Sequence, residues 1–528
     1  MRKVIIFLTF LGALAMTPAA LPAQSRSLRI SLQKIAPSEE DPGFFIRVND
    51  IQQWKPEQTA IIICDMWNEH WCKGATRRVA EMAPVMNNVI SIAREKGVLI
   101  VHAPSECIDY YKDHPGRRLA IKYGSKKYAA LINDRKLDSE KESVWPIDQS
   151  DEGCDCSPEC KLGTPWTHET DLLEISDSDA ISDSGSEIAG LFYKKGIKNV
   201  ILMGVHTNMC VIGRSFGLRN MIRLGFNVAL MRDMTDTMYD SKQWPNVSHF
   251  TGNSLMIEYI EKYVCPTLVS TDLTGQKQFR FREDNRPVVA FIIAENEYHA
   301  NRRLPEFGHE LLLTRGVNCE YALGKPVYTG EGIHNIENLQ ILKDADLMVV
   351  QVRRRALPSE QMDLVKDYVG SGKPVLGLRT ASHAFSVNQP KNGVAAELPD
   401  QWPEFDLEVL GGNYKNHYGT MPDPIVYSIV PGMDNHLLLK GVPAGDFTGI
   451  VAPLNSLYMN RPLRSPNIQV ILTGSIPGKP SEPVLWINNR QEGKVIYTSM
   501  GHWLDWDLQQ FRQIMFNAVD ILLNLPQK

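Results

Sequence analysis

The chain alternates short apolar runs with amphipathic segments, first over residues 59–231. Residues 59–64 (TAIIIC) are almost continuously apolar and rich in β-branched side chains, as expected of a strand buried in a parallel sheet. Residues 77–96 then carry apolar side chains close to helical spacing, and Gly97 follows as a favourable C-cap. Further strands are predicted at 98–101, 198–204 and 226–231, with a helix from about 210 to 224 between the last two. This alternation predicts an α/β domain with a doubly wound sheet.

A second α/β pattern follows a polar, charged stretch at 270–286, which we interpret as a linker. Beyond it the sequence predicts strands at 287–293, 345–350, 374–377 and 494–497, and a final amphipathic helix at 508–523. We therefore expect two doubly wound domains, at 55–269 and 287–528, each a mainly parallel sheet flanked by helices.

Two segments lack this pattern. Residues 24–54 are polar with scattered prolines, and we interpret them as a lead-in to the first domain. Residues 103–170 show no clear period and are predicted to form a long insertion near the C-terminal ends of the strands. Long loops in compact domains are often functional.

The N-terminus predicts export. Arg2 and Lys3 precede an almost wholly apolar stretch at 4–16, and small residues stand before Gln24. This pattern is typical of a cleaved signal peptide over residues 1–23. A membrane anchor is the alternative, but the stretch is short for a span of about 20 residues. We expect a periplasmic or secreted protein with no stable membrane anchor after cleavage.

The composition is that of a soluble globular protein: 528 residues, 43% hydrophobic and 22% charged, with a formal net charge of −5. Because phosphate binding needs concentrated Lys and Arg, this balance argues against nucleic acid as the main partner. A small-molecule substrate is the expected partner, and a homo-oligomer is possible.

Two reactive side chains follow predicted strands. Asp65 ends the run at 59–64, and Cys210 lies just beyond the strand at 198–204. Parallel sheets place their chemistry at these carboxyl ends. A helix N-terminus stabilises a thiolate and can stabilise an oxyanion, and a nearby carboxylate can accept the thiol proton and later protonate the leaving group. The pair therefore suggests acyl transfer from an amide or a related C–N bond.

Asp65 together with the sequence GVHTNMCV at 204–211 resembles the isochorismatase-like cysteine hydrolase superfamily, which includes nicotinamidases and carbamoyl-amide hydrolases. The resemblance covers about residues 55–265. It implies a cis peptide between Val205 and His206, in a turn that also contains Thr207 and Met209. We place Trp67, Asn68 and Arg214 as candidate substrate-binding residues, although Arg214 and Arg219 could equally lie on a solvated face.

The sequence departs from the family in one respect. The family has a catalytic Lys after its third strand, and residues 174–183 here contain none; Asp177 or Asp179 falls near the expected place. Activation of the thiol must then come from the helix dipole or from a Lys of the insertion. The candidates are Lys161, which we prefer, Lys126 and Lys127.

No metal or cofactor is expected. Some relatives bind a metal through Asp and His after the second strand, and that neighbourhood here contains His102, Asp109, Asp113 and His114, without the usual D-x-H pattern. Nine cysteines are present, and Cys154, Cys156 and Cys160 form a C-x-C-x₃-C cluster. A metal site there needs a fourth ligand, such as His168 or Cys107. We favour one disulfide that ties the loop down, with Cys72 or Cys107 as the partner.

The second domain resembles the trehalose-utilization (ThuA-like) family, which has the class I glutamine amidotransferase-like fold. The residues that carry the resemblance are 375–385 (VLGLRTASHAF), 411–419 (GGNYKNHYG), Asn435-His436 and 493–503 (GKVIYTSMGHW). The position of the amidotransferase nucleophile is Arg379, which cannot act as a nucleophile. His383, His417 and His502 could line a polar pocket with Arg379, or each could simply stabilise a loop.

The sequence thus predicts an exported cysteine hydrolase acting on a small amide-like substrate through Cys210, Asp65 and Lys161, fused to a ligand-binding domain. One alternative is a binding protein whose hydrolase fold is inactive. The other is a carbohydrate-linked activity in the ThuA-like domain.

Overall fold

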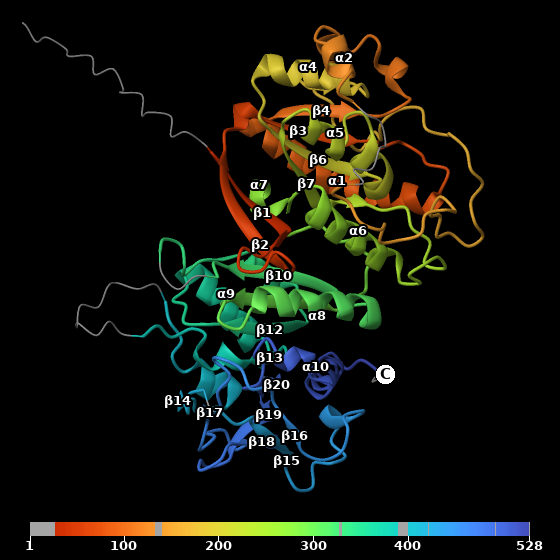
Figure 1. Cartoon of the computed structure of the whole chain (residues 1–528). Helices are drawn as coiled ribbons and strands as arrows, with labels where there is room; N and C mark the ends of the chain where they lie inside the picture. Colours follow the sequence, from red (N-terminus) through yellow and green to blue (C-terminus); the bar gives the residue numbers. More distant parts are fainter. Residues whose placement is uncertain are drawn as a thin grey trace, which may run out of the picture.

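The computed structural model describes residues 27–132, 140–326, 330–388, 400–420, 422–491 and 493–526. Two α/β domains stack along the long axis of the molecule (Figure 1). The predicted signal peptide lies outside the described residues. None of the helices among the described residues is both long enough and apolar enough to cross a membrane.

The first domain is built on an eight-stranded sheet of order β2-β1-β8-β7-β6-β3-β4-β5. Strands β8, β7, β6, β3, β4 and β5 pair in parallel. The strands are β1 (Leu28–Pro37), β2 (Phe45–Trp54), β3 (Thr59–Cys64), β4 (Leu99–Ala103), β5 (Ala180–Ile181), β6 (Asn199–Val205), β7 (Asn227–Asp236) and β8 (Thr267–Leu268). The predicted strands around Asp65 and Cys210 are confirmed.

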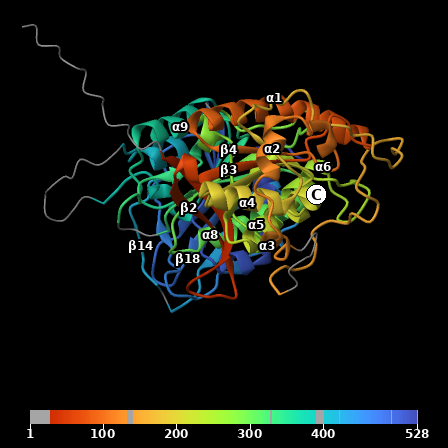
Figure 2. The same ribbon diagram turned by 90° about the horizontal axis from the view of Figure 1, so that it is seen from above.

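Helices cover both faces of this sheet. Figure 2 shows α1 on one side of β3 and β4 and α4 and α5 on the other, and the buried clusters of each face agree. The helices are α1 (Lys73–Lys96), α2 (Pro115–Ile121), α3 (Lys126–Ala129), α4 (Gly185–Lys195), α5 (Leu218–Arg223), α6 (His249–Tyr263) and α7 (Thr271–Thr274). Gly97 ends α1 in the left-handed conformation, as its place after the helical pattern predicts.

The second domain has a ten-stranded sheet of order β11-β10-β9-β12-β13-β20-β19-β18-β15-β16. Strands β10, β9, β12, β13 and β20 are parallel, and an antiparallel set extends from β20. Its strands are β9 (Val288–Ala294), β10 (Asn318–Gly324), β11 (Ile336–Glu337), β12 (Leu347–Val352), β13 (Val375–Leu378), β15 (Val426–Ile429), β16 (Phe447–Thr448), β18 (Ile468–Ser475), β19 (Glu482–Arg490) and β20 (Gly493–Thr498).

Helices α8 (Ala300–Arg315) and α10 (Gln509–Leu522) pack on one face of the second sheet, and α9 (Ser359–Gly370) packs on the other. A separate small sheet pairs β14 (Asn416–His417) with β17 (Tyr458–Met459). The expected fold class, two α/β domains with helix-flanked sheets, is confirmed.

Two local expectations were wrong. The residues interpreted as a lead-in form the β1–β2 hairpin, which joins the first sheet beside β8. The alternation of buried Leu28, Ile30 and Leu32 with more exposed neighbours is the signal that the overall polarity concealed. The helix predicted from about 210 to 224 is interrupted at 214–217, because the chain folds so tightly at Gly217 that a Cβ there would lie 2.8 Å from the Val211 carbonyl oxygen.

Candidate active site

Asp65 and Cys210 meet at the carboxyl edge of the first sheet. Strand β3 lies between β6 and β4, so the residues that follow these three strands converge. Burial and the charge of Asp65 both raise the pKa of the Cys210 thiol, so the carboxylate and the thiol are close enough to interact. Asp65 is fully buried, and Cys210 is 6% exposed. The predicted pair therefore shares one site.

The backbone fixes the Asp65 carboxylate. Asp65 has φ 48°, a conformation that side chains other than glycine rarely adopt, so the residue is held there by its surroundings. The Ser105 amide, just beyond β4, donates to Asp65 Oδ1 at 2.8 Å. Arg214 Nε lies 3.5 Å from Asp65 Oδ2. One carboxylate oxygen is thus held by the neighbouring loop, and the other faces the cation.

Arg214 is the cation of the site. Its amide donates to the Cys210 carbonyl at 2.9 Å, one helical turn along the chain, its guanidinium faces Asp65, and its charge opposes the rise in the pKa of the Cys210 thiol. Glu106 lies 3.3 Å from Arg214 on the outer side. Arg214, placed in the sequence as a substrate-binding residue, therefore occupies the charged position expected of a Lys.

The prediction of Lys161 as the third catalytic residue is corrected. Lys161 is exposed in the insertion, and the basic side chain that contacts both Asp65 and Cys210 is Arg214. Lys127 is also exposed, over the ring of Tyr128 at 5.5 Å, and the side chain of Lys126 lies outside the described residues. The spacing of Cys210 and Arg214, four residues apart, is the signal that could have identified this cation.

Burial sets the protonation of the pair. Burial raises the pKa of the Asp65 carboxyl, and Arg214 and the Cys210 thiol only partly oppose that shift. Burial and then the charge of Asp65 raise the pKa of the Cys210 thiol, against the opposing charge of Arg214. At neutral pH the thiol is therefore protonated before substrate arrives. Moving its proton to Asp65 leaves one negative charge on the pair, which Arg214 balances before and after the transfer.

The turn before Cys210 has the predicted cis peptide between Val205 and His206. The Thr207 hydroxyl lies 2.7 Å from the Thr235 hydroxyl on β7, so this side chain anchors the turn. His206 is buried, and its ring meets that of His70 edge-on at 4.9 Å. These contacts fix the backbone that presents Cys210.

Trp67 and Asn68 hold the insertion in place over the site. The Trp67 indole donates to the Ser105 carbonyl at 3.0 Å and stacks on Trp166 at 4.5 Å. The Asn68 side-chain oxygen accepts from the Thr167 amide at 3.0 Å. Asn68, expected to bind substrate, therefore ties the insertion to the end of β3, whereas Trp67 belongs to the same buried apolar cluster as Cys210 and Trp166 packs against that cluster.

His102 belongs to a buried ionic network. Its Nδ1 lies 2.6 Å from Glu169, and its Nε2 lies 3.4 Å from Asp179, which also receives two hydrogen bonds from Arg94. Burial alone would lower the pKa of His102, but the two carboxylates raise it to about 9. A protonated imidazole is no metal ligand, so His102 joins β4, α1 and the insertion instead.

Two further polar residues considered from the sequence, His114 and Asp177, are more exposed than His102. His114 accepts from the Gly116 amide at 3.0 Å and caps α2, and Asp177 is exposed. Among the described residues, the one group whose ligand atoms lie close enough for a metal ion contains Cys72, Cys154 and Cys156.

In the second domain, Arg379 follows β13 with φ 41°, at the sharp turn where an elbow was expected. Its guanidinium donates to the carbonyls of Ser499 and Leu454 at 3.0 and 3.1 Å, and it lies over the rings of Tyr298 and Tyr458. Arg379 is therefore a buried link between loops.

The expected histidines differ in setting. His383 is buried and stacks on Tyr414 at 4.7 Å, while His417 is exposed. His502 is fully buried and lies 3.1 Å from the Pro453 carbonyl. Burial and, to a smaller extent, the positive charge of Arg379 lower the pKa of His502 to about 3. Arg379, His383 and His502 thus lie near one another around the turn that follows β13, together with tyrosine side chains.

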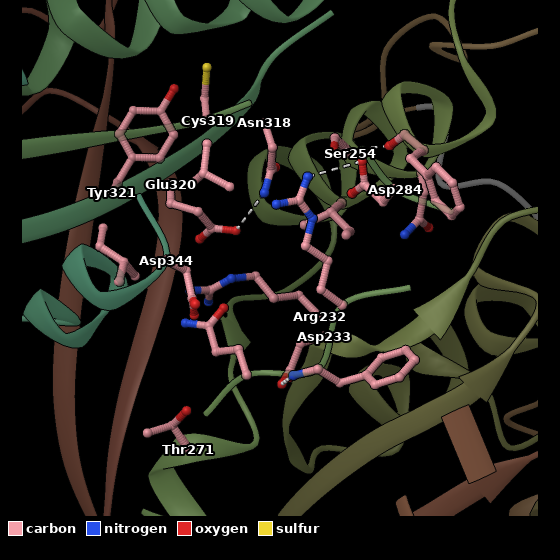
Figure 3. A pocket seen from close by; sticks show the side chains of 18 of the residues that line it. Arg232, Asp233, Ser254, Thr271, Asp284, Asn318, Cys319, Glu320, Tyr321 and Asp344 are labelled. Carbon is pink, nitrogen blue, oxygen red and sulfur yellow. Dashed lines mark hydrogen bonds and ion pairs between the residues drawn. The ribbon is translucent and has the colours of Figure 1, made fainter. Parts of the chain in front are cut away.

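A cavity of about 520 Å³ lies between the two domains, away from Asp65 and Cys210 (Figure 3). Its lining combines Arg232 and Asp233 of β7 with Asn318 and Glu320 of β10. Arg286, from the predicted linker, donates to the Ser254 hydroxyl at 3.1 Å. Sequence reasoning missed this cavity, because its residues come from elements far apart in the chain.

Residues 59–246 match the family model described as the isochorismatase domain. Several solved structures are similar to parts of this chain. A ThuA-like protein from Parabacteroides merdae is 13% identical, with 46% of this chain and 92% of that chain covered and a TM-score of 0.32. A cysteine hydrolase from Pseudomonas syringae pv. phaseolicola is 15% identical, with 42% and 92% covered and a TM-score of 0.26. An isochorismatase family protein from Burkholderia thailandensis is 13% identical, with 42% and 95% covered and a TM-score of 0.26.

Proposed function

We propose that the protein, whose residues 59–246 match the isochorismatase domain, is a cysteine hydrolase that cleaves a C–N bond of a small amide-like substrate. The observation that carries the proposal is the convergence of Cys210, Asp65 and Arg214 at the carboxyl edge of the first sheet, where Arg214 lies 3.5 Å from Asp65 and both charges act on the Cys210 thiol. A nucleophile, a proton acceptor and a fixed positive charge are the parts that acyl transfer through a thioester requires.

In the first half-reaction, the Cys210 thiol transfers its proton to Asp65 while the sulfur attacks the substrate carbonyl. The tetrahedral intermediate collapses when Asp65 returns that proton to the leaving nitrogen, and a thioester on Cys210 remains. Arg214 stays charged throughout and balances the negative charge of the site.

In the second half-reaction, water attacks the thioester carbonyl and gives a proton to Asp65. Collapse of the intermediate expels the Cys210 thiolate, which takes the proton back from Asp65 and releases a carboxylic acid. Because Cys210 is only 6% exposed, we expect the acyl group that reaches it to be small.

We propose that the second domain binds a ligand and has no nucleophilic chemistry of its own at the elbow. Support comes from Arg379, which fills that position and is engaged with two backbone carbonyls. The proposed export of the protein, through a signal peptide at residues 1–23, is tested by sequencing the N-terminus of the protein recovered from a bacterial periplasm.

The proposed hydrolase activity is tested by ammonia release from a panel of small primary amides and N-carbamoyl compounds. The Cys210→Ser variant should lose turnover by a factor of at least about 10³, because a hydroxyl is a far weaker nucleophile than a thiol beside the same carboxylate. Cys265→Ser, which changes another buried cysteine of the same domain, is the matched control and should keep wild-type turnover.

Equal turnover by the two variants would contradict the proposal. Binding of a panel compound with no turnover by the wild type would favour the inactive binding protein that the sequence left open. Loss of activity on changing Arg379, with Cys210→Ser still active, would place the chemistry in the second domain.

A further inference from the structure

Four cysteines from two distant segments gather beside the N-terminus of α1. Cys72 immediately precedes the helix, and Cys154, Cys156 and Cys160 belong to the insertion. Cys72 Sγ lies 3.3 Å from Cys154 Sγ and 3.8 Å from Cys156 Sγ. Cys160 packs against this group, and its sulfur would have to move closer to complete a set with the other three, which lie within 4.8 Å of one another. One small region therefore collects four of the nine cysteines of the chain.

The spacing of these sulfurs is not that of a disulfide. All nine cysteines lie within the described residues, and all are free thiols. The disulfide expected from the sequence is therefore absent, and Cys107 lies apart from this group, near Asp65. Bonded sulfurs are about 2.0 Å apart. Sulfurs that share a tetrahedral zinc ion at about 2.3 Å lie about 3.8 Å from one another.

The backbone around the cluster suits thiolates. The Gly74 amide donates to Cys156 Sγ at 3.2 Å, and the Lys73 amide donates to Cys160 Sγ at 3.4 Å. These are free N–H groups of the first turn of α1, where the helix dipole favours negative charge. Such hydrogen bonds stabilise sulfur that carries negative charge, and they are of little use to a disulfide.

Gly74 makes this approach possible. A Cβ at this position would lie 3.3 Å from Cys156 Sγ and 3.0 Å from Asp155 Oδ1, which is tighter than ordinary packing. Arg78, one turn further along α1, is 5% exposed and lies 3.4 Å from Asp155. Positive charge and helix N–H groups therefore face the cluster from the side of α1.

We propose that Cys72, Cys154, Cys156 and Cys160 form a tetrathiolate site for a divalent transition metal, with zinc as the expected ion. Four protein ligands leave no open position, so the ion is structural and takes no part in the hydrolysis. The fourth ligand that the loop motif required is Cys72, in place of His168 or Cys107. His168 instead stacks on Tyr110 and lies near Asp171.

The site connects the insertion to the catalytic turn. Met209, next to the nucleophile, packs against the cluster formed by Cys72, Cys154 and Met238. Cys72 is also the last residue of the segment between β3 and α1, and Asp65 is the first. A metal ion at this point would fix the distance between the insertion and the turn that presents Cys210.

The test is the metal content of the full chain, purified without added metal or chelator, together with a count of its thiols after denaturation in chelator. We expect about one zinc ion per chain and nine reactive thiols. Cys156→Ser should lose most of the metal, while Cys265→Ser, outside the cluster, should keep it. Metal-free protein would overturn the proposal, whether its four cluster thiols are free or joined in disulfides.

A spectroscopic readout covers the case in which Cys156→Ser does not fold. Wild-type protein in which cobalt(II) replaces the ion should show intense sulfur-to-metal charge-transfer absorption and the visible bands of tetrahedral cobalt. Cobalt-loaded protein that shows only the weak bands of octahedral oxygen ligation would contradict a tetrathiolate site. Neither measurement depends on the hydrolase activity.

Discussion

At the scale of single residues, the site differs from the family pattern in its cation. A Lys can exchange protons, whereas the guanidinium of Arg214 stays charged at any pH at which the protein is folded. In the proposed mechanism, the proton therefore moves between Cys210 and Asp65 alone. Arg214 contributes charge, which matters because both partners are buried.

Replacing Arg214 tests that division of roles. Arg214→Gln should lower kcat/KM by about 10²–10³-fold, since a preorganised charge is removed from a buried site. Its loss also removes the interaction that holds down the pKa of Asp65, so the acid limb of the pH–rate profile should move to higher pH. The kcat/KM of Arg214→Lys, which keeps the charge, should lie between those of Arg214→Gln and wild type. An unchanged profile in Arg214→Gln would show that Arg214 has no part in the site.

The sequence supports residue assignments unevenly. Asp65 and Cys210 could be located because each ends a strand, and parallel strands bring such positions together. Arg214 was named as a substrate-binding residue, and its position beside Asp65 was not foreseen, since it depends on the interrupted helix after Cys210. The contact of Asn68 with Thr167 was not foreseen either, because Thr167 lies 99 residues away in a segment without periodicity.

At the scale of elements, the insertion is held by buried polar contacts more than by secondary structure. Glu169 of the insertion and Asp179, just before β5, both meet His102 near the end of β4, and Asp179 also pairs with Arg94 on α1. The protonated imidazole is the centre of this network. The stability that it provides must therefore depend on pH.

The folded-state pKa of His102, about 9, lies above its ordinary value of 6.5. Its contribution to stability is complete below pH 6.5 and is lost as the pH rises to about 9. The shift corresponds to a free energy on the order of 3 kcal/mol. Between pH 6 and pH 9, the free energy of unfolding measured in urea should fall further for wild type than for His102→Gln, in which this titration is absent. Equal losses in the two proteins would show that His102 is neutral in the fold.

The predicted and observed strands agree where strands are buried on both faces and differ at the β1–β2 hairpin. Apolar runs located β3, β6, β9 and β12 within a residue or two, because strands buried on both faces need continuous apolar sequence. The β1–β2 hairpin was missed, because its exposed side chains make the average composition polar although every second residue of the start of β1 is buried.

At the scale of the whole molecule, the β1–β2 hairpin joins the two domains. Arg47 on β2 is 4% exposed; it pairs with Glu258 and Glu261 of α6 and lies 4.2 Å from the centre of the Tyr321 ring on β10. A hairpin of the first sheet thus connects a helix of its own domain with a strand of the second (Figure 1). The domains are expected to unfold together.

Arg47→Met leaves the charge of Glu261 buried without its cation. This change should lower the free energy of unfolding by about 3–5 kcal/mol. Calorimetry should then resolve two transitions where the wild type has one, because the link between the domains is weakened. Arg282→Met, at a site whose side chain is 90% exposed, is the control and should unfold like wild type. Two transitions already present in the wild type would contradict the coupling of the domains.

The central claim is that Cys210 forms a covalent acyl intermediate. The most direct measurement is acid quenching during turnover of the best substrate in the amide panel, followed by peptide mass spectrometry. We expect the peptide that contains Cys210 to gain the mass of the substrate's acyl group less one hydrogen, and the same peptide from Cys210→Ser to gain none. Turnover of Cys210→Ser at the wild-type rate, or an acyl group found on a different side chain, would contradict it.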